Sequence, residues 1–472
     1  LYQAFREVKK TFDPAGLMNP GKIIDAQDIA ENLRIDPDYT TSFPKTHFHF
    51  QQEKGFDRAI ELCTGVGHCR KSLSGTMCPS YIATRDEEHS TRGRANALRL
   101  AIAGKLGPDG LTSQRLYEVL DLCLECKACK SECPSGVDMA RLKSEFLAHY
   151  YQKHGLPLGK RFISRIRETA RWASRFPTLS NWFMDLSISR WLLERLTGID
   201  RRRSLPPVAQ QTFTAWCREH LDGGQPDQDQ QQVAIFVDTF TNFYEPQVGI
   251  AAVRLLEGLN FRVVMADIGC CGRPLISAGQ LAQVKEMAQL LNQQLQQFAD
   301  QKIPVIVLEP SCWSTIHDDY PNLLNGAPGS QPISSTVVTL EDFLNRDEVA
   351  SRLSEKMGVG PDEILFHGHC QQKALQGIEG SLSSLKSLKQ TQLQAIDSGC
   401  CGMAGSFGYD QKHYQISGQI GEDRLFPALR KASEKAEVVA SGFSCRSQIQ
   451  HFTGRKARHL AEVLADCLVR EP

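Results

Sequence analysis

The sequence predicts a chain of several domains, in which a helical domain with clustered cysteines precedes two copies of an α/β domain. Three observations support this prediction. The 472 residues correspond to about three or four domains. One stretch, Cys123-Leu-Glu-Cys126-Lys-Ala-Cys129-Lys-Ser-Glu-Cys133-Pro134, carries four cysteines at short, regular intervals. The sequence Gly-Cys-Cys-Gly occurs twice, at residues 269–272 and 399–402, which indicates an internal repeat.

The composition excludes several kinds of protein. The chain has 54 basic and 54 acidic residues, so it lacks the basic excess of a nucleic-acid-binding protein, and we expect no nucleic-acid partner. It contains no run of about 18 apolar residues, so no membrane-spanning helix is predicted. The 16 cysteines are too sparse for a disulfide scaffold and lie in clusters. This pattern favours a reducing, cytoplasmic location with thiolates held as metal ligands.

The first 50 residues are predicted to form a tail with one helix. Leu1, Phe5 and Val8 follow a helical period, and the stretch Phe12-Asp-Pro-Ala-Gly-Leu-Met-Asn-Pro-Gly-Lys22 then supplies two turn signals. A short strand is predicted at residues 46–50. Because the chain begins with leucine, we expect it to be a fragment or a processed piece.

Residues 51–150 carry a metal-ligating pattern. The spacing C-x2-C-x2-C-x3-C-P of the Cys123 stretch is that of bacterial ferredoxins. There, three thiolates on one loop bind one iron–sulfur cluster, and the fourth cysteine, turned away by proline, reaches another. A second, looser run consists of Cys63, Cys69 and Cys78-Pro79, with Val66 where a second cysteine would stand. The alternatives are a zinc knuckle or chance, and zinc sites use paired C-x2-C units, which fit this spacing poorly.

The two runs predict two iron–sulfur clusters that exchange their fourth ligands. Cluster B takes a complete set, Cys123, Cys126, Cys129 and Cys78, whereas cluster A takes only Cys63, Cys69 and Cys133. Valine cannot ligate iron. Cluster B is therefore expected to be [4Fe–4S]. Cluster A is either [3Fe–4S] or takes a fourth ligand, for which His68 and His89 lie nearest in the sequence.

A helix is predicted between the two cysteine runs. Ser90 or Thr91 can cap it, and it continues to Ile102. Cations near thiolate-bound clusters raise the reduction potential, and this stretch supplies three of them: Arg85, Arg92 and Arg94. An ordinary charged surface helix is an equally good explanation of these arginines.

Residues 151–232 are predicted to form a helical connector that ends in a glutamine-rich linker, Gly223–Gln232. Basic and apolar side chains interleave in its first part: Lys160, Arg161, Arg165, Arg167, Arg171 and Arg175 with Phe162, Ile163, Ile166, Trp172 and Phe176. Such a basic amphipathic helix could dock on an anionic membrane surface or an acidic partner. An ordinary solvated helix face is the favoured alternative. Cys217 is expected to be a small buried residue rather than a ligand.

Two α/β domains are predicted at residues 233–350 and 362–472. Each begins with a buried-strand pattern and closes with a helical segment: the strands lie at 233–237 and 363–367, and the helices at 340–344 and 460–464. Alternating strands and helices indicate parallel sheets, with the site in the loops at the carboxyl ends of the strands.

Comparison of the two copies indicates which one keeps the metal ligands. Cys370 precedes Cys400 by 400 − 370 = 30 positions, and 30 positions before Cys270 the first copy has Phe240. The second copy therefore keeps Cys370, Cys400, Cys401 and Cys445 for a candidate third centre, whereas the first keeps Cys270, Cys271 and Cys312. Adjacent cysteines readily share a multi-iron centre, and the flanking glycines allow a close backbone approach. The alternatives are a structural relic or, in the second copy, a four-cysteine zinc site.

Two of these segments resemble known families. The stretch from Phe12 to Lys22 resembles the extreme C-terminus of FAD-linked oxidases of the vanillyl-alcohol-oxidase type, which implies an FAD-binding domain upstream of Leu1. The doubled Gly-Cys-Cys-Gly pattern resembles the cysteine-rich CCG domains of heterodisulfide reductases and of iron–sulfur subunits of glycolate and lactate oxidation. In those domains a non-cubane cluster uses a further cysteine three places after the last one. This chain has Thr315 and Gln448 there.

The order of the segments resembles the C-terminal half of FAD and iron–sulfur D-2-hydroxy-acid dehydrogenases, of the D-lactate or D-2-hydroxyglutarate type. The resemblance implies that an upstream flavin removes hydride from a small 2-hydroxy acid, and that the clusters pass single electrons to a quinone or a redox protein. No catalytic residue is expected in this stretch. Together with the basic helix, the resemblance leads us to expect peripheral association with the inner face of the membrane.

Three alternatives to this function stay open. One is a thiol–disulfide redox subunit like that of heterodisulfide reductase, and another is a glycolate-oxidase-type iron–sulfur subunit. The third is a non-enzymatic scaffold stabilised by zinc.

Overall fold

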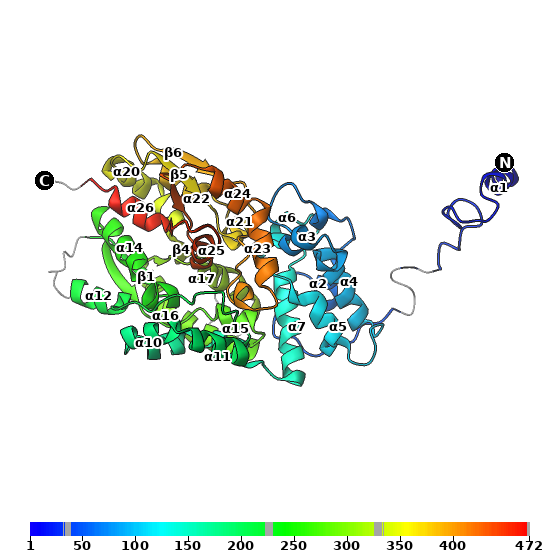
Figure 1. The fold of residues 1–472 in the computed structure, drawn as a ribbon, viewed down its shortest axis with the longest axis horizontal. Coiled ribbons are helices and arrows are strands. Elements are labelled where there is room, and N and C mark those ends of the chain that lie inside the picture. Colours follow the sequence, from blue (N-terminus) through cyan, green and yellow to red (C-terminus); the bar gives the residue numbers. More distant parts are fainter. Residues whose placement is uncertain (32, 34–38, 222–229, 325–332, 334, 470–472) are drawn as a thin grey trace.

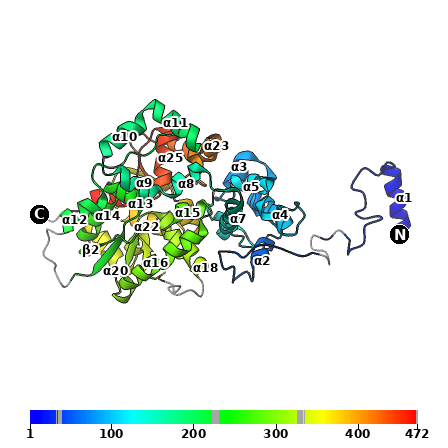
Figure 2. The ribbon, with the colours of Figure 1, turned by 90° about the horizontal axis from the view of Figure 1, so that it is seen from below.

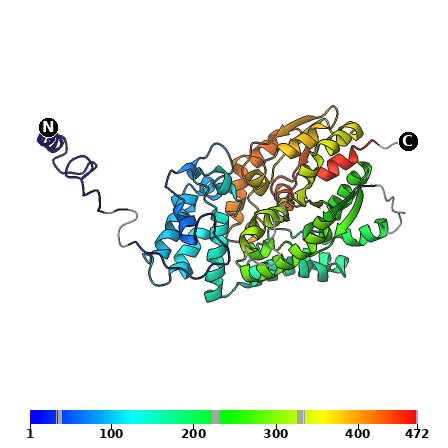
Figure 3. The ribbon, with the colours of Figure 1, turned by 180° about the vertical axis from the view of Figure 1, so that it is seen from behind.

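A computed structural model describes residues 1–31, 33, 39–221, 230–324, 333 and 335–469. Its body consists of a small all-helical domain beside a larger pair of α/β domains (Figure 1). Helix α1, Tyr2–Phe12, stands away from this body and buries none of its side chains (Figures 1 and 3).

The turn predicted after α1 is present. The carboxylate of Asp13 accepts hydrogen bonds from the backbone N–H groups of Leu17 and Met18, both at 2.9 Å.

The helical domain is assembled on one long helix, α7, which spans Met139–His154 and is buried along most of its length. The other helices are α2 (Phe56–Glu61), α3 (Pro79–Thr84), α4 (Thr91–Ile102), α5 (Gln114–Asp121) and α6 (Ala128–Glu132). Of these, α2, α4 and α5 pack directly on α7. Ser90 is the N-cap of α4, as predicted, because its hydroxyl accepts a hydrogen bond from the N–H of Gly93 at 3.0 Å.

The strand predicted at residues 46–50 is wrong, because this segment is an irregular loop. Its backbone N–H groups do not pair with a neighbouring strand. Those of His47 and Phe48 donate to the carboxylate of Glu145 on α7, at 2.9 and 3.0 Å. The alternation of phenylalanine and histidine in this segment still determines its packing, since Phe48 and Phe50 are both buried in the core.

The connector is a layer of short helices rather than one amphipathic helix. Its members are α8 (Leu158–Ser164), α9 (Ile166–Ala173), α10 (Pro177–Asp185), α11 (Ser187–Thr197) and α12 (Phe213–Leu221). Pro177 stands at the start of α10, where its missing N–H costs nothing, and it prevents α9 from continuing. The layer lies along one side of the α/β domains (Figure 2). Cys217 is buried, as predicted, and most of the predicted linker lies outside the described residues.

The repeat folds twice into the same four-stranded parallel sheet, with strand orders β2-β1-β3-β4 and β6-β5-β7-β8. The first sheet contains β1 (Gln232–Phe236), β2 (Arg262–Ala266), β3 (Val305–Val307) and β4 (Val337–Thr339). The second contains β5 (Glu363–Phe366), β6 (Gln392–Ala395), β7 (Glu437–Val439) and β8 (Ala457–Arg458). The first strand of each copy is interior and almost fully buried, as expected for parallel strands covered on both faces.

Helices alternate with the strands in both copies. The first copy contains α13 (Thr239–Phe243), α14 (Pro246–Gly258), α15 (Arg273–Ser277), α16 (Leu281–Asp300), α17 (Pro310–Ser314), α18 (Tyr320–Leu324), α19 (Leu340–Leu344) and α20 (Asp347–Lys356). The second contains α21 (Cys370–Leu375), α22 (Glu379–Lys386), α23 (Tyr414–Asp423), α24 (Leu425–Lys431), α25 (Phe443–Thr453) and α26 (Leu460–Asp466). The helical segments predicted to close the copies are α19 and the greater part of α26.

The domains pack closely against one another. Helix α14 of the first copy packs on α26 of the second. Helices α21 and α23 of the second copy contact α6 and α3 of the helical domain, and α16 of the first copy contacts α7. One hydrophobic core therefore continues from Phe48 in the helical domain into both α/β copies.

Candidate metal centres

Four cysteines surround one buried cavity in the helical domain, here termed cavity B. Cys78 stands just before α3, and Cys123, Cys126 and Cys129 lie on the loop that leads into α6. Two other residues of this loop, Glu125 and Lys127, have left-handed φ angles of 52° and 60°. Such conformations are uncommon for residues other than glycine and are typical of loops shaped around a site.

A second cavity, termed cavity A, adjoins cavity B. It is lined by the three cysteines of the predicted set A, Cys63, Cys69 and Cys133. Val66 and His68 also line it, and both side chains are largely exposed. The ring of His89 is engaged elsewhere, with Nδ1 2.9 Å from Oγ1 of Thr84. Of the two histidines considered as a fourth ligand, the structure brings only His68 to cavity A.

The three predicted tuning arginines are placed differently. Arg94 is completely buried beside cavity B, and its guanidinium donates a hydrogen bond to Sγ of Cys78 at 3.3 Å. Arg92 lines cavity A, and its backbone N–H donates to Sγ of Cys69 at 3.4 Å. Arg85 has a left-handed backbone at the end of α3, and its side chain is exposed and lines neither cavity. The structure therefore brings Arg92 and Arg94 to the cysteines, but not Arg85.

The thiols around cavity B suit a cationic metal centre. Burial raises the pKa of Cys126 and of Cys129 well above the usual value for a thiol, and it also raises the pKa of Cys123. Ionising these thiols together therefore requires positive charge close by. Arg94 supplies part of this charge, and bound iron would supply the rest, because thiolates are the protein ligands of iron–sulfur clusters.

The second α/β copy gathers its four cysteines at the carboxyl edge of its sheet. Cys370 begins α21 just after β5, Cys400 and Cys401 follow β6, and Cys445 lies on α25 after β7. All four are buried. The hydrogen bond from Cys400 lowers the pKa of Cys370 to about 6. Gly402, with a φ of 92°, is needed here because a side chain would overlap the carbonyl oxygen of Ser417.

A buried histidine, His367, completes this group. One ring nitrogen of His367 and the sulfur atoms of Cys401 and Cys445 all lie within 4.8 Å of one another. The sequence analysis did not single out His367. Its only signal was its place at the end of a strand, three residues before Cys370.

The first α/β copy has three cysteines in the equivalent position. The sulfur atoms of Cys271 and Cys312 are 3.0 Å apart, and Cys270 accepts a hydrogen bond from the N–H of Gly272 at 3.5 Å. Phe240, which stands where the second copy has Cys370, stacks on Phe443 with ring centroids 4.4 Å apart. An aromatic contact between the two copies thus occupies the position of the missing cysteine.

Both copies face one cavity of about 400 Å³, termed the shared cavity. The cysteines that line it come from both copies: Cys270, Cys271, Cys312, Cys370, Cys400 and Cys401. The other walls are mainly apolar and include Phe162 and Ile166 of the connector, together with Phe240, Tyr244 and Phe443. The connector helices therefore cover the edge at which the two sheets present their cysteines.

The shared cavity and cavity B meet at the Cys123 run, where Leu124 lines both. The side-chain amide of Gln371 donates to the carbonyl of Glu125 at 3.1 Å, and Arg273 pairs with the Glu125 carboxylate at 2.6 Å. After burial, the proximity of Cys370 is the largest cause of the raised pKa of Cys126. The thiol groups of the two domains are therefore close neighbours.

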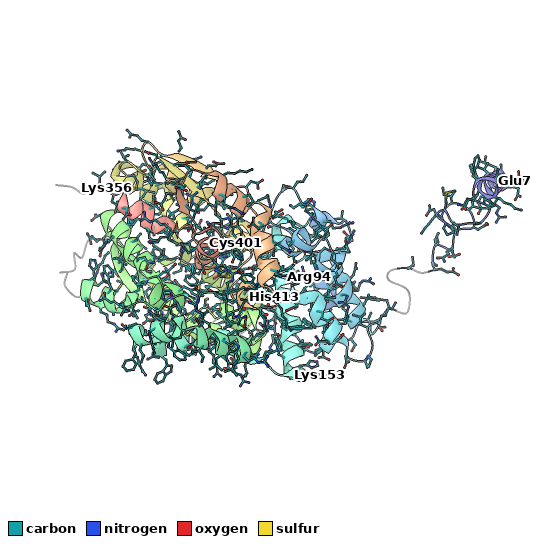
Figure 4. The ribbon with its side chains drawn as sticks, viewed as in Figure 1. Glu7, Arg94, Lys153, Lys356, Cys401 and His413 are labelled. Atoms are coloured by element: carbon teal, nitrogen blue, oxygen red, sulfur yellow. The ribbon has the colours of Figure 1, made fainter. Side chains whose placement is uncertain are left out.

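Residues that hold the domains together were not found from the sequence. Lys127 is fully buried, and its ammonium lies 2.7 Å from Asp319 and 2.8 Å from Asp318 of the first copy. His413 of the second copy lies 2.8 Å from Asp121. Figure 4 shows His413 at the boundary between the domains, with Arg94 on the helical side and Cys401 inside the α/β pair. No spacing rule relates charges that are so far apart in the sequence.

Comparison with protein-family models identifies three segments. Residues 59–137 match the 4Fe-4S dicluster domain. Residues 236–317 match the cysteine-rich domain, and residues 1–23 match the C-terminal domain of FAD linked oxidases.

Comparison with curated proteins finds relatives over most of the chain. The D-2-hydroxyglutarate dehydrogenase of Escherichia coli (strain K12) is 26% identical over 99% of this chain and 49% of its own length. The glycolate oxidase iron-sulfur subunit of the same organism is 24% identical, over 88% of this chain and 96% of its own length. One of the subunits of its anaerobic glycerol-3-phosphate dehydrogenase is 28% identical, over 62% of this chain and 73% of its own length.

The chain thus spans about half the length of the D-2-hydroxyglutarate dehydrogenases it matches. The predicted resemblance is confirmed: the chain joins the end of an FAD-linked oxidase domain to a 4Fe–4S dicluster domain and a cysteine-rich domain, and it is similar to the C-terminal half of D-2-hydroxyglutarate dehydrogenases.

Proposed function

We propose that this chain is the electron-transfer portion of an FAD-linked dehydrogenase that oxidises a D-2-hydroxy acid, lactate or 2-hydroxyglutarate, and reduces a quinone or a similar acceptor. The observation that carries this proposal is the succession of three cysteine-lined cavities. Met77 and Thr91 line both cavity A and cavity B, and Leu124 lines both cavity B and the shared cavity. The similarity to D-2-hydroxyglutarate dehydrogenases supports the substrate class.

The ligands of the first two clusters are assigned from the cavities. Cluster B would be held by Cys78, Cys123, Cys126 and Cys129, and cluster A by Cys63, Cys69 and Cys133, either as [3Fe–4S] or with His68 as a fourth ligand. Iron–sulfur clusters supply one-electron transfer, which divides the two-electron oxidation of a hydroxy acid into single steps. Hydrogen bonds from backbone N–H groups to the ligating sulfur atoms would adjust the reduction potentials of these clusters. The backbone N–H of Met139, for example, donates to Sγ of Cys129 at 3.4 Å.

The third centre is assigned to the second copy, with Cys370, Cys400, Cys401 and Cys445 as ligands. These cysteines are buried together, and the pKa of Cys370 is lowered, which favours its thiolate at neutral pH. The first copy contributes Cys270, Cys271 and Cys312 to the opposite wall of the shared cavity but lacks a counterpart of Cys370.

The shared cavity is the proposed site of the electron acceptor. Its volume and its aromatic and aliphatic walls suit a quinone ring, and pockets of this kind bind largely apolar ligands. Among the described residues, every helix is too short or too polar to cross a bilayer. A membrane quinone would therefore be reached by peripheral association.

The tail points to where electrons enter. Residues 1–23 match the end of an FAD-linked oxidase domain, and the segment that follows joins the body at the helical domain (Figure 1). FAD and the hydroxy-acid substrate would belong to that upstream domain. Cavity A would then receive electrons first, and the shared cavity would deliver them.

One observation favours a second candidate function, thiol–disulfide exchange. The sulfur atoms of Cys271 and Cys312, 3.0 Å apart, need only a small approach to form a bond, and the two electrons and two protons released would reduce a disulfide substrate to two thiols. If this chemistry were the function, Cys312→Ser would abolish turnover while leaving the iron content unchanged.

Metal analysis and turnover of the anaerobically purified protein, produced with its upstream domain, test the main proposal. We expect about seven or eight irons from the two ferredoxin-type clusters, with matching acid-labile sulfide. We also expect reduction of a quinone by a D-2-hydroxy acid. The Cys467→Ser variant is the control, because Cys467 lines none of the three cavities. Zinc without iron or sulfide would instead establish the zinc-stabilised scaffold.

A further inference from the structure

We propose that His367 is a nitrogen ligand of the metal centre in the second α/β copy, an inference that rests on the third centre proposed above. The side chain is buried at the end of β5. Its Nε2 has no hydrogen-bond partner of normal geometry among the described residues, and the ring interacts with the side chain of Cys401. Buried polar atoms are rarely left without a partner, so this nitrogen calls for an explanation.

The tautomer of His367 suits a ligand. Nδ1 lies 2.7 Å from Oγ of Ser398, and the Ser398 hydroxyl in turn donates to the carbonyl of Ile396 at 3.4 Å. Because the hydroxyl proton is used in this way, Ser398 accepts the proton of Nδ1–H. Nε2 is then left with its lone pair, on a ring that has one nitrogen within 4.8 Å of the sulfur atoms of Cys401 and Cys445. Metal-binding histidines typically donate their second ring N–H to such a partner.

The internal repeat supports the same assignment. His367 precedes Cys400 by 400 − 367 = 33 positions, and 33 positions before Cys270 the first copy has Val237. The first copy therefore lacks the histidine as well as Cys370. A joint absence of two neighbouring donors is expected if both served one metal centre.

His367 also supplies a donor where Gln448 does not. The side-chain amide of Gln448 donates to the carbonyl and the hydroxyl of Ser417, both at 3.1 Å. This bonding directs the Gln448 amide towards Ser417. The four cysteines and His367 together form a mixed sulfur and nitrogen donor set, as also occurs in Rieske-type centres.

Pulsed electron paramagnetic resonance on the anaerobically purified protein tests this proposal. We expect a ¹⁴N hyperfine coupling of a directly bound nitrogen on the third centre. His367→Ala should abolish it and reduce the iron of that centre at least twofold. His367→Cys, which offers a sulfur donor, should restore the iron without restoring the coupling. Ser398→Ala should keep the coupling, because it removes only the partner of Nδ1.

Two results would overturn the assignment of His367, and a third result would show instead that the proposed third centre is absent. If Cys400→Ser lowers the iron content but the wild-type protein shows no bound-nitrogen coupling, the third centre exists and His367 is not its ligand. If His367→Ala keeps both the coupling and the iron, the nitrogen comes from another residue. If Cys400→Ser changes nothing, the third centre itself is absent.

An independent observation assigns a partner to the connector layer: we infer that its outer face docks on an anionic lipid bilayer. Large apolar side chains of α8–α11 are exposed there: Leu158, Phe162, Trp172, Phe176, Leu179, Trp182, Phe183, Ile188, Trp191, Leu192 and Leu196. Three of the five tryptophans of the chain belong to this face, termed the connector face, and each is at least half exposed. Tryptophan with surrounding apolar side chains is typical of helices that lie in the membrane interface.

The charge of the connector face suits anionic lipid. The exposed basic side chains of residues 158–197 are Arg161, Arg165, Arg171, Arg175 and Arg195, and the exposed acidic ones are Glu168 and Asp185. The difference, 5 − 2 = +3, contrasts with the zero formal charge of the chain. Arg175 lies 4.1 Å above the ring of Trp172, which places positive charge beside an exposed aromatic group. Basic residues near anionic lipid each contribute about 1 kcal/mol of attraction.

The connector face also adjoins the shared cavity. Phe162, Ile166 and Phe183 come from the same helices and line that cavity. An apolar molecule in the bilayer would thus meet a continuous apolar lining. A second copy of the chain is a poorer occupant, because two such basic faces would repel. The upstream domain is also a poorer one, since the tail leaves the body at the helical domain (Figure 3).

Sedimentation of the full-length protein with phosphatidylcholine vesicles, with and without phosphatidylglycerol, tests this docking. We expect binding only to the anionic vesicles, and about a tenfold loss with Trp182→Ser/Trp191→Ser. Leu290→Ser is the matched control, because Leu290 is an exposed apolar residue on α16. Turnover with a water-soluble acceptor should be unchanged in both.

Three results would overturn the docking inference. Equal binding to neutral and anionic vesicles would remove the electrostatic argument. A double variant that binds vesicles normally but turns a dimer into a monomer would assign the face to a second copy. A double variant that binds vesicles normally but loses its flavin domain to limited proteolysis would assign the face to that domain.

Discussion

The guanidinium of Arg94 donates a hydrogen bond to the sulfur of Cys78 at 3.3 Å, and neither side chain is open to solvent. The same guanidinium donates to the hydroxyl of Ser80 and to the carbonyl of Val119, at 2.8 and 3.2 Å. A buried cation is therefore fixed beside one ligand of the proposed cluster B. A positive charge in this position favours the reduced, more negative state of a thiolate-bound cluster.

We expect Arg94→Gln to lower the reduction potential of cluster B. A hydrogen bond to a charged group is worth about 1.5 kcal/mol or more, which corresponds to roughly 60 mV for a one-electron couple. Redox titration followed by electron paramagnetic resonance measures this change. Arg85→Gln is the control, since Arg85 is exposed and lines neither cavity. Equal effects of the two variants would contradict a specific role for Arg94.

The exchanged ligands predict opposite effects for two cysteines. Cys78→Ser should impair cluster B and spare cluster A, although Cys78 belongs to the first cysteine run in the sequence. Cys133→Ser should impair cluster A and spare cluster B, because Cys133 lines cavity A. The separate signals of the two clusters can be followed by electron paramagnetic resonance in partly reduced samples. The reverse outcome would show that each run binds its own cluster.

Val66→Cys should change the type of cluster A. Val66 lines cavity A at the place of the missing second cysteine. If cluster A is [3Fe–4S] in the wild-type protein, the new thiolate should bind a fourth iron and replace the signal of an oxidised [3Fe–4S] cluster with that of a reduced [4Fe–4S] cluster. Val66→Ser, which adds a polar group without a thiolate, is the control and should leave the wild-type signal in place.

The two α/β copies should tolerate cysteine loss differently. Cys400→Ser should lower iron content and turnover, because Cys400 is buried among the four cysteines of the second copy. Cys270→Ser should have a smaller effect, because Cys270 is partly exposed in the copy that has Phe240 instead of a further cysteine. Iron analysis of the two purified variants measures the difference. Equal losses would show that both copies hold metal.

The stability that His459 contributes to the fold should decrease as the pH falls, because its imidazole takes up a proton more readily in the unfolded chain. This buried side chain caps α26: Nδ1 accepts the N–H of Ala461 at 3.0 Å, and Nε2–H donates to the carbonyl of Leu308 at 3.1 Å. Burial, reinforced by the charge of Arg446, lowers the pKa of His459 to about 3. In the unfolded chain the imidazole is protonated below about pH 6.5. The stability it contributes is therefore present above that pH and is lost progressively below it.

At pH 5.5 this loss should be about 1.4 kcal/mol relative to pH 7.5. His459→Asn keeps a capping side chain without a titratable group, so this part of the pH dependence should vanish in the variant. Urea unfolding of the wild-type protein and the variant at the two pH values measures the difference. An identical pH dependence for both proteins would show that His459 does not contribute.

The sequence allowed the main architecture and the grouping of the cysteines to be predicted, for identifiable physical reasons. The duplicated strand patterns correspond to two sheets of the same strand order. The predicted sets A and B line separate cavities because the ferredoxin spacing depends on local loop geometry. The strand at residues 46–50 was predicted wrongly, since the bonding of its backbone to Glu145, a distant residue, leaves no trace in local periodicity.

The relations between domains could not be predicted from the sequence. The approach of Cys126 to Cys370 and the pairing of Lys127 with Asp318 depend on how separate domains dock. His367 lacked the spacing of a known ligand motif, and only its position beside two thiols distinguishes it. The division of the basic stretch between α8 and α9 also went unpredicted.

The isolation of α1 has a consequence for how proteins of this kind evolve. Because α1 buries none of its side chains, the hydrophobic core of the body is assembled without it. The junction is therefore a place where a gene can be split or joined without disturbing the folded body. The relatives include both forms: a dehydrogenase twice as long as this chain, and a separate iron-sulfur subunit of nearly the same extent as the body. A body similar to this one thus occurs both within a longer chain and as a separate subunit.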